Sequence, residues 1–404
     1  MAIEKSLYQA PEGVPPMPEG EGLEIDIVDP EMVTLNDGSV EVTIIPEADV
    51  SGTGEFDENL ADVMEENDLK ILASDIVEMV DSDVDSRKDW ADTFVKGLDV
   101  LGFKYEERTE PWEGACGVYS TVLAEAAIRF QAETMGETFP AAGPVKTKIL
   151  GQETKEKEEA AARVKADMNY QLTENMVEYR PEHERLLYSL GLAGSAFKKV
   201  YYDEIMQRTV SKFVPADDLV VPYTATSLDD AETIIHVVKM SENELRKQQV
   251  GGFYRDIELT PGQPNETESE KKERELGGIS KGRDQRMFTL LECHATLDIE
   301  GFEDTDTEGE PTGIKLPYIV TIEEGSREVL SIRRNYEIGD ATRSKIQYFV
   351  HFKFLPGLGF YGFGLIHMIG GLSRSATAAL RSLLDAGTLS NLPAGFKMRG
   401  IKMR

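Results

Sequence analysis

The chain has 404 residues, of which 40% are hydrophobic and 29% charged, and its formal net charge is −31. This length and apolar content predict two or three domains with hydrophobic cores, and the absence of any run of about 18 apolar residues argues against a transmembrane helix. The strong negative charge repels phosphate at long range, which excludes an ordinary DNA-coating protein.

The first region, residues 1–58, is an acidic arm. Residues 1–69 contain 19 Asp or Glu and a single basic residue, Lys5. Residues 1–22 are rich in Pro, Glu and Gly, which predicts disorder, and they lack the apolar segment of a signal peptide. Alternating apolar residues on both sides of the Asn36-Asp37-Gly38 sequence predict a β-hairpin.

The second region, residues 59–195, is predicted to be mainly helical. Apolar residues recur at steps of three and four over 59–101, and a further helix is predicted at 120–138. Residues 141–151 have the pattern of a strand. A long helix rich in Lys, Glu and Ala is predicted over 154–179, with an interruption at Pro181 and a second helix over 182–193.

The third region, residues 196–355, is predicted to be rich in strands. The expected strands lie at 196–203, 208–214, 219–223, 232–240, 286–299, 317–323, 328–334 and 347–355. Ser241 and Glu244 form a capping box that predicts the start of a short helix. The polar stretch 256–284 is interpreted as a linker with, at most, a helical turn.

The last region, residues 356–404, is predicted to hold a glycine-rich loop, a helix over 372–386 that ends at Gly387, and a basic end. Residues 341–404 contain nine Lys or Arg and one acid, Asp385. Such a basic stretch is either a solvated patch or a surface that faces phosphate or acid. Helical and strand blocks that follow each other in this way predict an α+β fold with long helices and antiparallel sheet regions.

Searches for catalytic and ligand-binding motifs give no assignment. Gly357–Gly362 matches G-x-G-x-x-G, but Pro356 and the aromatic residues of the motif favour a mobile or tightly packed loop over a nucleotide site. No phosphate loop is present, and neither the histidines nor the acidic runs have the spacing of a metal site. Cys116 and Cys293 are not part of a paired motif. We therefore expect no catalytic residue, cofactor or metal, and no enzyme.

Several segments nevertheless resemble one known family, the portal proteins of short-tailed bacteriophages. They occur in family order, and their joint order makes the resemblance specific. The segments are Arg87–Trp90 with Gly97 and Leu98, Pro111–Ala115, Ala126–Ala132 with Phe139 and Pro140, Gly191–Tyr202, Phe213–Tyr223, Gly362–His367 and Leu383–Gly395.

The resemblance implies a subunit with wing and stem elements, in a ring of twelve copies at a capsid vertex in the virion, made in the host cytoplasm. Double-stranded DNA would pass through the ring, and terminase, capsid or scaffold proteins and tail adaptors would dock on it. Portal proteins usually continue beyond this length, which suggests a truncated chain. The alternatives are another virion structural protein, such as a capsid protein or tail adaptor, or a nucleotide-binding enzyme.

Two groups of residues are candidates for contacts in such an assembly. Basic side chains near the end of the chain are predicted to meet DNA phosphate or an acidic neighbouring subunit; they are Lys397, Arg399, Lys402 and Arg404. Aromatic side chains in loops are predicted to pack within a loop or against a neighbouring subunit; they are Trp112, Phe360, Tyr361 and Phe363.

Overall fold

The computed structural model describes residues 56–103, 107–110, 112–203, 206–259, 267–277, 287–305, 312–340 and 342–391, together with two short strands near the N-terminus. The chain divides into two units, Met1–Asp49 and Val50–Arg404. In the first unit β1 (Met32–Thr34) pairs with β2 (Val40–Val42) in antiparallel fashion, which confirms the predicted hairpin. The predicted disorder of residues 1–22 lies outside the described residues.

The second unit begins with helices at the positions that the periodicity predicted. A short 3₁₀ helix, Leu60–Asp62, precedes α1 (Glu66–Ser86) and α2 (Lys88–Leu98), and the two α-helices meet at Arg87. The next helix, α3, spans Val122–Thr138. Apolar side chains on one face of α1 and α2 are buried, as expected for amphipathic helices that cover a core.

The following helices depart from the prediction at Pro181. Helix α4 (Lys155–Tyr170) passes into a π-helical turn (Gln171–Asn175), and α5 (Tyr179–Ala193) begins after a break at residues 176–178. The predicted interruption at Pro181 is wrong, because this proline lies in the first turn of α5, where the backbone N–H has no helical partner.

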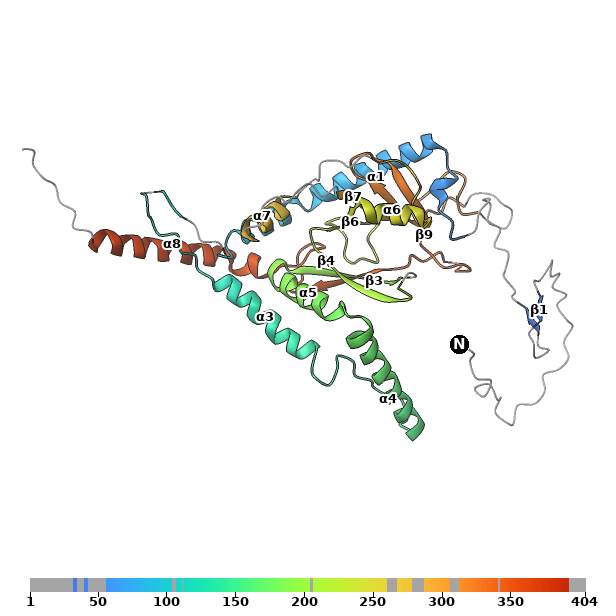
Figure 1. Cartoon of the computed structure of the whole chain (residues 1–404), viewed down its shortest axis with the longest axis horizontal. Helices are drawn as coiled ribbons and strands as arrows, with labels where there is room; N and C mark the ends of the chain where they lie inside the picture. The colour runs from blue at the N-terminus through green and yellow to red at the C-terminus, as the bar shows by residue number, and fades with distance from the viewer. Residues whose placement is uncertain are drawn as a thin grey trace, which may run out of the picture. The chain divides into compact units, whose positions relative to one another are not determined.

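Two antiparallel sheets form the centre of this unit (Figure 1). The five-stranded sheet has the order β5-β6-β7-β8-β9, and the three-stranded sheet has the order β10-β3-β4. Their strands are β3 (Ser195–Asp203), β4 (Arg208–Pro215), β5 (Leu219–Val220), β6 (Thr233–Ser241), β7 (Met287–Leu297), β8 (Leu316–Glu323), β9 (Val329–Arg334) and β10 (Phe349–Lys353). Helices with two antiparallel sheets confirm the α+β fold class.

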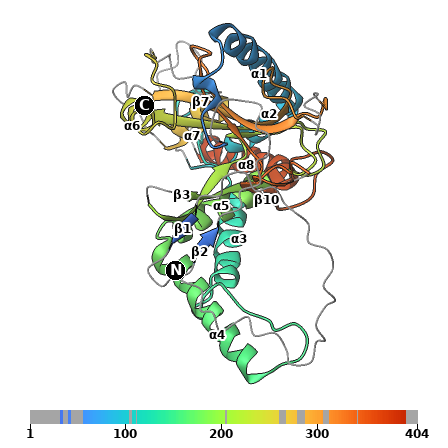
Figure 2. The same ribbon diagram turned by 90° about the vertical axis from the view of Figure 1, so that its right-hand side faces the viewer.

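The two faces of the five-stranded sheet have different coverings. Residues that alternate along β7, such as Leu291 and Cys293, pack in one core with the buried face of α1. A second core lies around α2, α3 and the first turn of α8 (Leu365–Asn391), and it includes Phe197 and Phe349 from the three-stranded sheet. Figure 2 shows α4 extending away from both sheets, and no residue of α4 is buried.

One short helix follows β6, and a second lies within the predicted linker. Ser241 and Glu244 form the predicted capping box at the start of α6 (Glu242–Val250), with both reciprocal hydrogen bonds present. Helix α7 (Glu268–Gly277) lies within the stretch 256–284 and is longer than the single turn that we expected there.

Two predicted elements are wrong in type or extent. Residues 141–151 form no strand and run as an irregular segment beside α4. The last helix was predicted over 372–386, but α8 starts at Leu365 and continues past Gly387 to Asn391. Its first turn is held by Ile366, which is 4% exposed, so core packing offsets the low helix propensity of the glycines.

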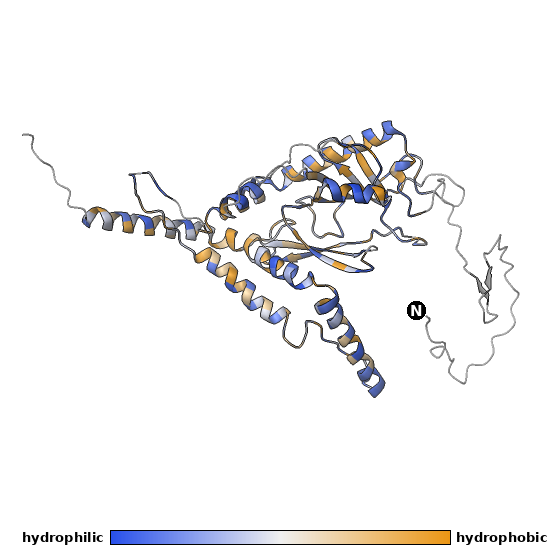
Figure 3. Ribbon diagram, viewed as in Figure 1, coloured by the Kyte–Doolittle hydropathy of each residue, from blue (hydrophilic) through white to orange (hydrophobic). Residues whose placement is uncertain are grey.

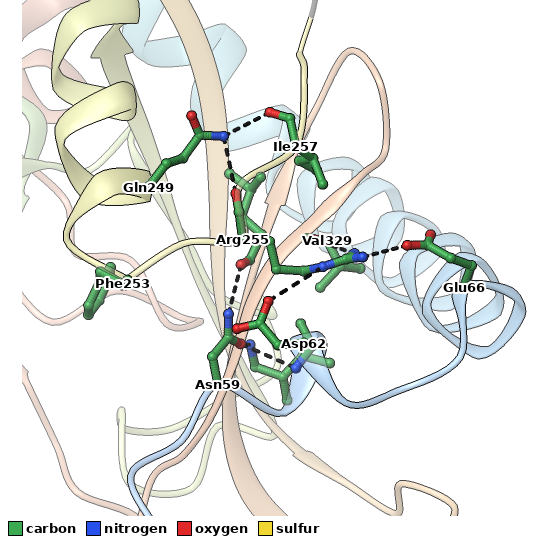
Figure 4. Close-up of polar contacts among 12 residues, drawn as sticks. Asn59, Asp62, Glu66, Gln249, Phe253, Arg255, Ile257 and Val329 are labelled. Atoms are coloured by element: carbon green, nitrogen blue, oxygen red, sulfur yellow. Dashed lines mark hydrogen bonds and ion pairs between the residues drawn. The ribbon is translucent and has the colours of Figure 1, made fainter.

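The edge strand β9 is covered by side chains of its own chain (Figure 4). The Asn59 side chain donates to the Leu330 carbonyl at 3.2 Å and accepts from the Ile332 N–H at 2.9 Å, as a neighbouring strand would. The Arg255 N–H also donates to the Leu330 carbonyl, and the Arg255 guanidinium pairs with Glu66 of α1. This edge is therefore not free to add a strand from another molecule.

Among the described residues, no helix has both the length and the apolar character that crossing a lipid bilayer requires.

Candidate functional site

A buried arginine links the α1–α2 corner to the loop between β4 and β5. The Arg87 guanidinium is held by carbonyl oxygens of this loop, at 2.6 Å from Ala216, 2.6 Å from Asp217 and 3.1 Å from Leu219. Arg87 is 8% exposed. Because a buried guanidinium needs acceptors for its N–H groups, these contacts fix the path of the loop over the helix corner.

Tyr361 extends this network into the glycine-rich segment. Its hydroxyl donates to the Leu219 carbonyl at 2.9 Å, accepts from the Val221 N–H at 3.1 Å and lies 3.2 Å from the Arg87 guanidinium. The Trp90 ring stacks on the Tyr361 ring at 4.7 Å, and the Trp90 Nε1–H donates to the Gly362 carbonyl at 3.3 Å. Burial raises the pKa of Tyr361, so the hydroxyl stays neutral.

The glycines bring two backbone segments into direct contact. Gly194 has a φ of +93°, and a Cβ built there would lie 2.3 Å from backbone atoms of Phe363 and Gly364. A Cβ at Gly362 would lie 2.5 Å from the Gly194 carbonyl oxygen. The Ser195 hydroxyl accepts the Gly362 N–H at 2.7 Å. We call this packed region of Arg87, Trp90, Gly194, Tyr361 and Gly362 the junction.

This geometry accounts for the G-x-G-x-x-G match without a nucleotide. A Cβ at Gly357 would lie 2.2 Å from the Tyr361 carbonyl oxygen, and one at Gly359 would lie 2.4 Å from the Tyr223 ring. Helix α8 begins only at Leu365, so no helix N-terminus lies within the motif. In a dinucleotide-binding motif, the glycines leave room for the pyrophosphate to approach the backbone. Here protein atoms already occupy that space.

The four aromatic candidates have different surroundings. Phe360 and Tyr361 are completely buried within this chain, so loop packing is the role their side chains have here. Phe363 is half-buried and lies 5.4 Å from the His367 ring. Trp112 is half-buried in a turn, where its carbonyl accepts the Ala115 N–H. Lys397, Arg399, Lys402 and Arg404 lie outside the described residues.

A partly buried ionic cluster between the two sheets was not predicted. Lys199 of β3 reaches across to Glu292 of β7, with its Nζ 2.5 Å and 2.6 Å from the two carboxylate oxygens. The Nε2 atom of His294 lies 2.8 Å from the same carboxylate, and the Nδ1 atom of His236 lies 3.8 Å from it. A signal was present in the sequence, because Glu292 is the one acid within the apolar strand β7.

The electrostatics of this cluster favour a fixed internal pair. Burial acts to raise the pKa of Glu292, but the Lys199 charge and the two histidines hold it well below its usual range. Burial lowers the pKa of His236, which keeps that ring neutral. The rings of His236 and His294 pack edge-on against Phe349, at 5.5 Å and 5.3 Å. The arrangement joins the sheets and leaves the carboxylate 17% exposed.

Carboxylates gather on the outer side of the junction. Burial, together with the neighbouring Asp217, raises the pKa of Asp218 to about 7, and burial also raises the pKa of Glu273 on α7. The described part of the chain contains no group of three or more His, Cys, Asp or Glu side chains that is arranged to hold a metal ion. Among the described residues, these carboxylates therefore give no metal site.

Comparison with protein-family models and with curated proteins found no match for this chain.

Proposed function

We propose that this chain is a subunit of a portal-like ring at a capsid vertex, through which double-stranded DNA enters and leaves. The observation that carries the proposal is the meeting of the resembling segments at the junction. Arg87–Trp90, Gly191–Tyr202, Phe213–Tyr223 and Gly362–His367 are far apart in sequence, and each supplies a contact there. These segments therefore contribute to one packed region of the fold and not to separate surfaces.

The charge of the chain is compatible with a conduit. DNA moves freely through a channel that makes few phosphate contacts, because each cationic contact releases counterions and adds affinity. A chain with a net charge of −31 offers few such contacts unless its basic residues gather on the inner wall. In this proposal terminase docks during packaging, tail adaptors dock afterwards, and the ring has twelve copies.

The absence of a catalytic arrangement at the junction fits a structural role. Its polar groups are used in contacts with each other, and no described side chain there is both exposed and activated as a nucleophile or base. Bond-making chemistry during packaging would then belong to the docking motor.

The test is direct imaging of the purified full chain by negative-stain electron microscopy, with native mass spectrometry for the subunit number. We expect closed rings of about twelve subunits, as the family resemblance implies, with a central hole. A chain that stays monomeric at high concentration, or that turns over a nucleotide alone, would contradict the proposal. A closed assembly without a hole would favour another virion structural protein.

A further inference from the structure

Helix α8 has a polar face turned inward. Beside it runs an extended segment that we call the strap, residues 115–120. The Asp385 carboxylate accepts the Cys116 N–H at 2.7 Å, and the Thr377 hydroxyl accepts the Ser120 N–H at 3.0 Å. The Arg381 Nε–H donates to the Val118 carbonyl at 2.8 Å. Three of the side chains buried on this face are therefore polar: Ser373, Thr377 and Asp385.

The opposite face of α8 is apolar and exposed. Leu372 is 69% exposed, Leu383 is 70% exposed and Met368 is 57% exposed. Spacings of 4 and 11 residues place these three side chains on one face, with small alanines between them. Figure 3 shows apolar residues along the length of α8. We call this surface the outer face of α8. Beyond the first turn, where Ile366 is buried in the core, α8 departs from the usual pattern, in which a helix turns its apolar side chains towards its own core.

The outer face also carries no acid, although the molecule as a whole is acidic. Over Leu365–Asn391 the only carboxylate is Asp385, which is 9% exposed and bound to the strap. The two arginines of the helix, Arg374 and Arg381, follow Leu372 by two and nine residues, about 200° and 180° around the helix, so they lie away from the outer face. Two copies that each carry a net charge of −31 repel over most of their surfaces. They can approach with least repulsion where one copy presents an uncharged face.

From these observations we propose that the outer face of α8 packs against a second copy of this chain. The proposal rests on the ring proposed above and names the surface by which neighbouring subunits meet. The contact is head-to-tail, because one helix face then meets a different surface of the next copy and the series can close. Apolar burial of Leu372 and Leu383 supplies the attraction.

The test introduces charge into the outer face without disturbing the inner one. One double variant carries Leu372→Glu and Leu383→Glu. The control carries Ile314→Glu and Ile338→Glu, at two exposed isoleucines (56% and 55%) outside α8. Both variants add the same charge at exposed positions, and circular dichroism checks that both are folded. Analytical ultracentrifugation of the full chain then measures association.

We expect the α8 variant to associate at least about 100-fold more weakly than the wild type, because burying two carboxylates in an apolar contact is costly. The matched variant should assemble like the wild type. An α8 variant that still forms the wild-type ring would overturn this inference and leave the proposed function standing. A wild-type chain that never associates would overturn both.

Two further outcomes also count against the inference. Equal weakening in both variants would mean that added charge alone, and not the outer face, controls association. An α8 variant that assembles normally but melts at a lower temperature would mean that the chain's own residues cover the outer face.

Discussion

The junction and the outer face of α8 differ in how they place large side chains: the junction buries them, and the outer face leaves them exposed. At the junction, Tyr361 is completely buried, and its hydroxyl has partners in two other segments of the same chain, at Arg87 and at residues 219–221. On α8, Leu372 and Leu383 are about 70% exposed, while polar side chains are buried on the inner face. Tyr361 and Leu372 nevertheless lie close together in sequence, on either side of the start of α8.

If the outer face meets a neighbouring copy as we propose, the stability of the single chain and the contact with a neighbour depend on different residues. Burial of the junction contributes to the free energy of folding, since its polar groups are satisfied and its rings are packed. The outer face contributes little until another surface covers it. Substitutions in the two regions should therefore have separable effects, and the following predictions test this separation from the largest effect to the smallest.

The largest effect is expected at the closest backbone contact of the junction. Gly194→Ala should lower the free energy of unfolding by about 4 kcal/mol, because the residue has a positive φ and its Cβ would overlap a second backbone segment. Gly252→Ala is the matched control, with a φ of +72° and nothing within 4 Å of the added Cβ. The control should lose only about 1 kcal/mol. Urea denaturation measures both, and equal losses would show that the close contact is unimportant.

A smaller effect is expected from pH. Burial, with a lesser contribution from Lys353, lowers the pKa of His351 to about 3, and its ring lies between Phe197 and Phe360. A pKa that is depressed on folding stabilises the fold above the unfolded value of about 6.5 and loses that contribution as the pH falls towards 3. At pH 5 the loss should be about 2 kcal/mol relative to pH 8.

The measurement compares the wild type with His351→Gln, by urea denaturation at pH 8 and at pH 5. The variant should lack this part of the acid-induced loss. The raised pKa of Asp218 acts in the opposite direction, but it is present in both proteins and cancels in the difference. Parallel pH curves for the two proteins would contradict a buried, neutral His351.

The smallest effect is expected on the outer face. Leu372→Ser with Leu383→Ser should change the free energy of unfolding of the dissociated chain by less than about 0.5 kcal/mol, because exposed side chains away from special contacts contribute little. Thermal and urea unfolding at a concentration below that of assembly measure this. A loss of more than about 2 kcal/mol would show that these leucines are buried by their own chain, which would end the contrast with the junction.

Much of the secondary structure follows from local patterns. The three- and four-residue spacing of apolar residues predicted α1, α2 and α3, and alternation predicted the strands of both sheets. The capping box at Ser241 and Glu244 was predicted from the two residue types and their spacing alone. These features depend on contacts within a few residues, so the sequence carries them directly.

Packing overrode the local pattern in two places. Gly370 and Gly371 favoured a loop, yet they lie inside α8, because Ile366 is buried in the core and polar side chains of α8 bind the strap. Residues 141–151 alternate like a strand, but they pair with no strand of the described part of the chain, and Val145 is held by the side chain of Asn169 on α4. A strand needs a neighbouring strand to accept and donate its backbone hydrogen bonds, and an alternating sequence alone does not supply one.

The sequence by itself determined the α+β class, most of the elements and the excess of acid that any partner must accommodate. Only the tertiary structure decided which residues meet. The Lys199–Glu292 pair depends on how two sheets face each other, and the junction depends on contacts between residues more than 250 positions apart. The strap also determines which face of α8 is covered, because it binds Thr377 and Asp385 on the inner face. The physical reason is that side-chain chemistry is local, whereas burial depends on the whole path of the chain.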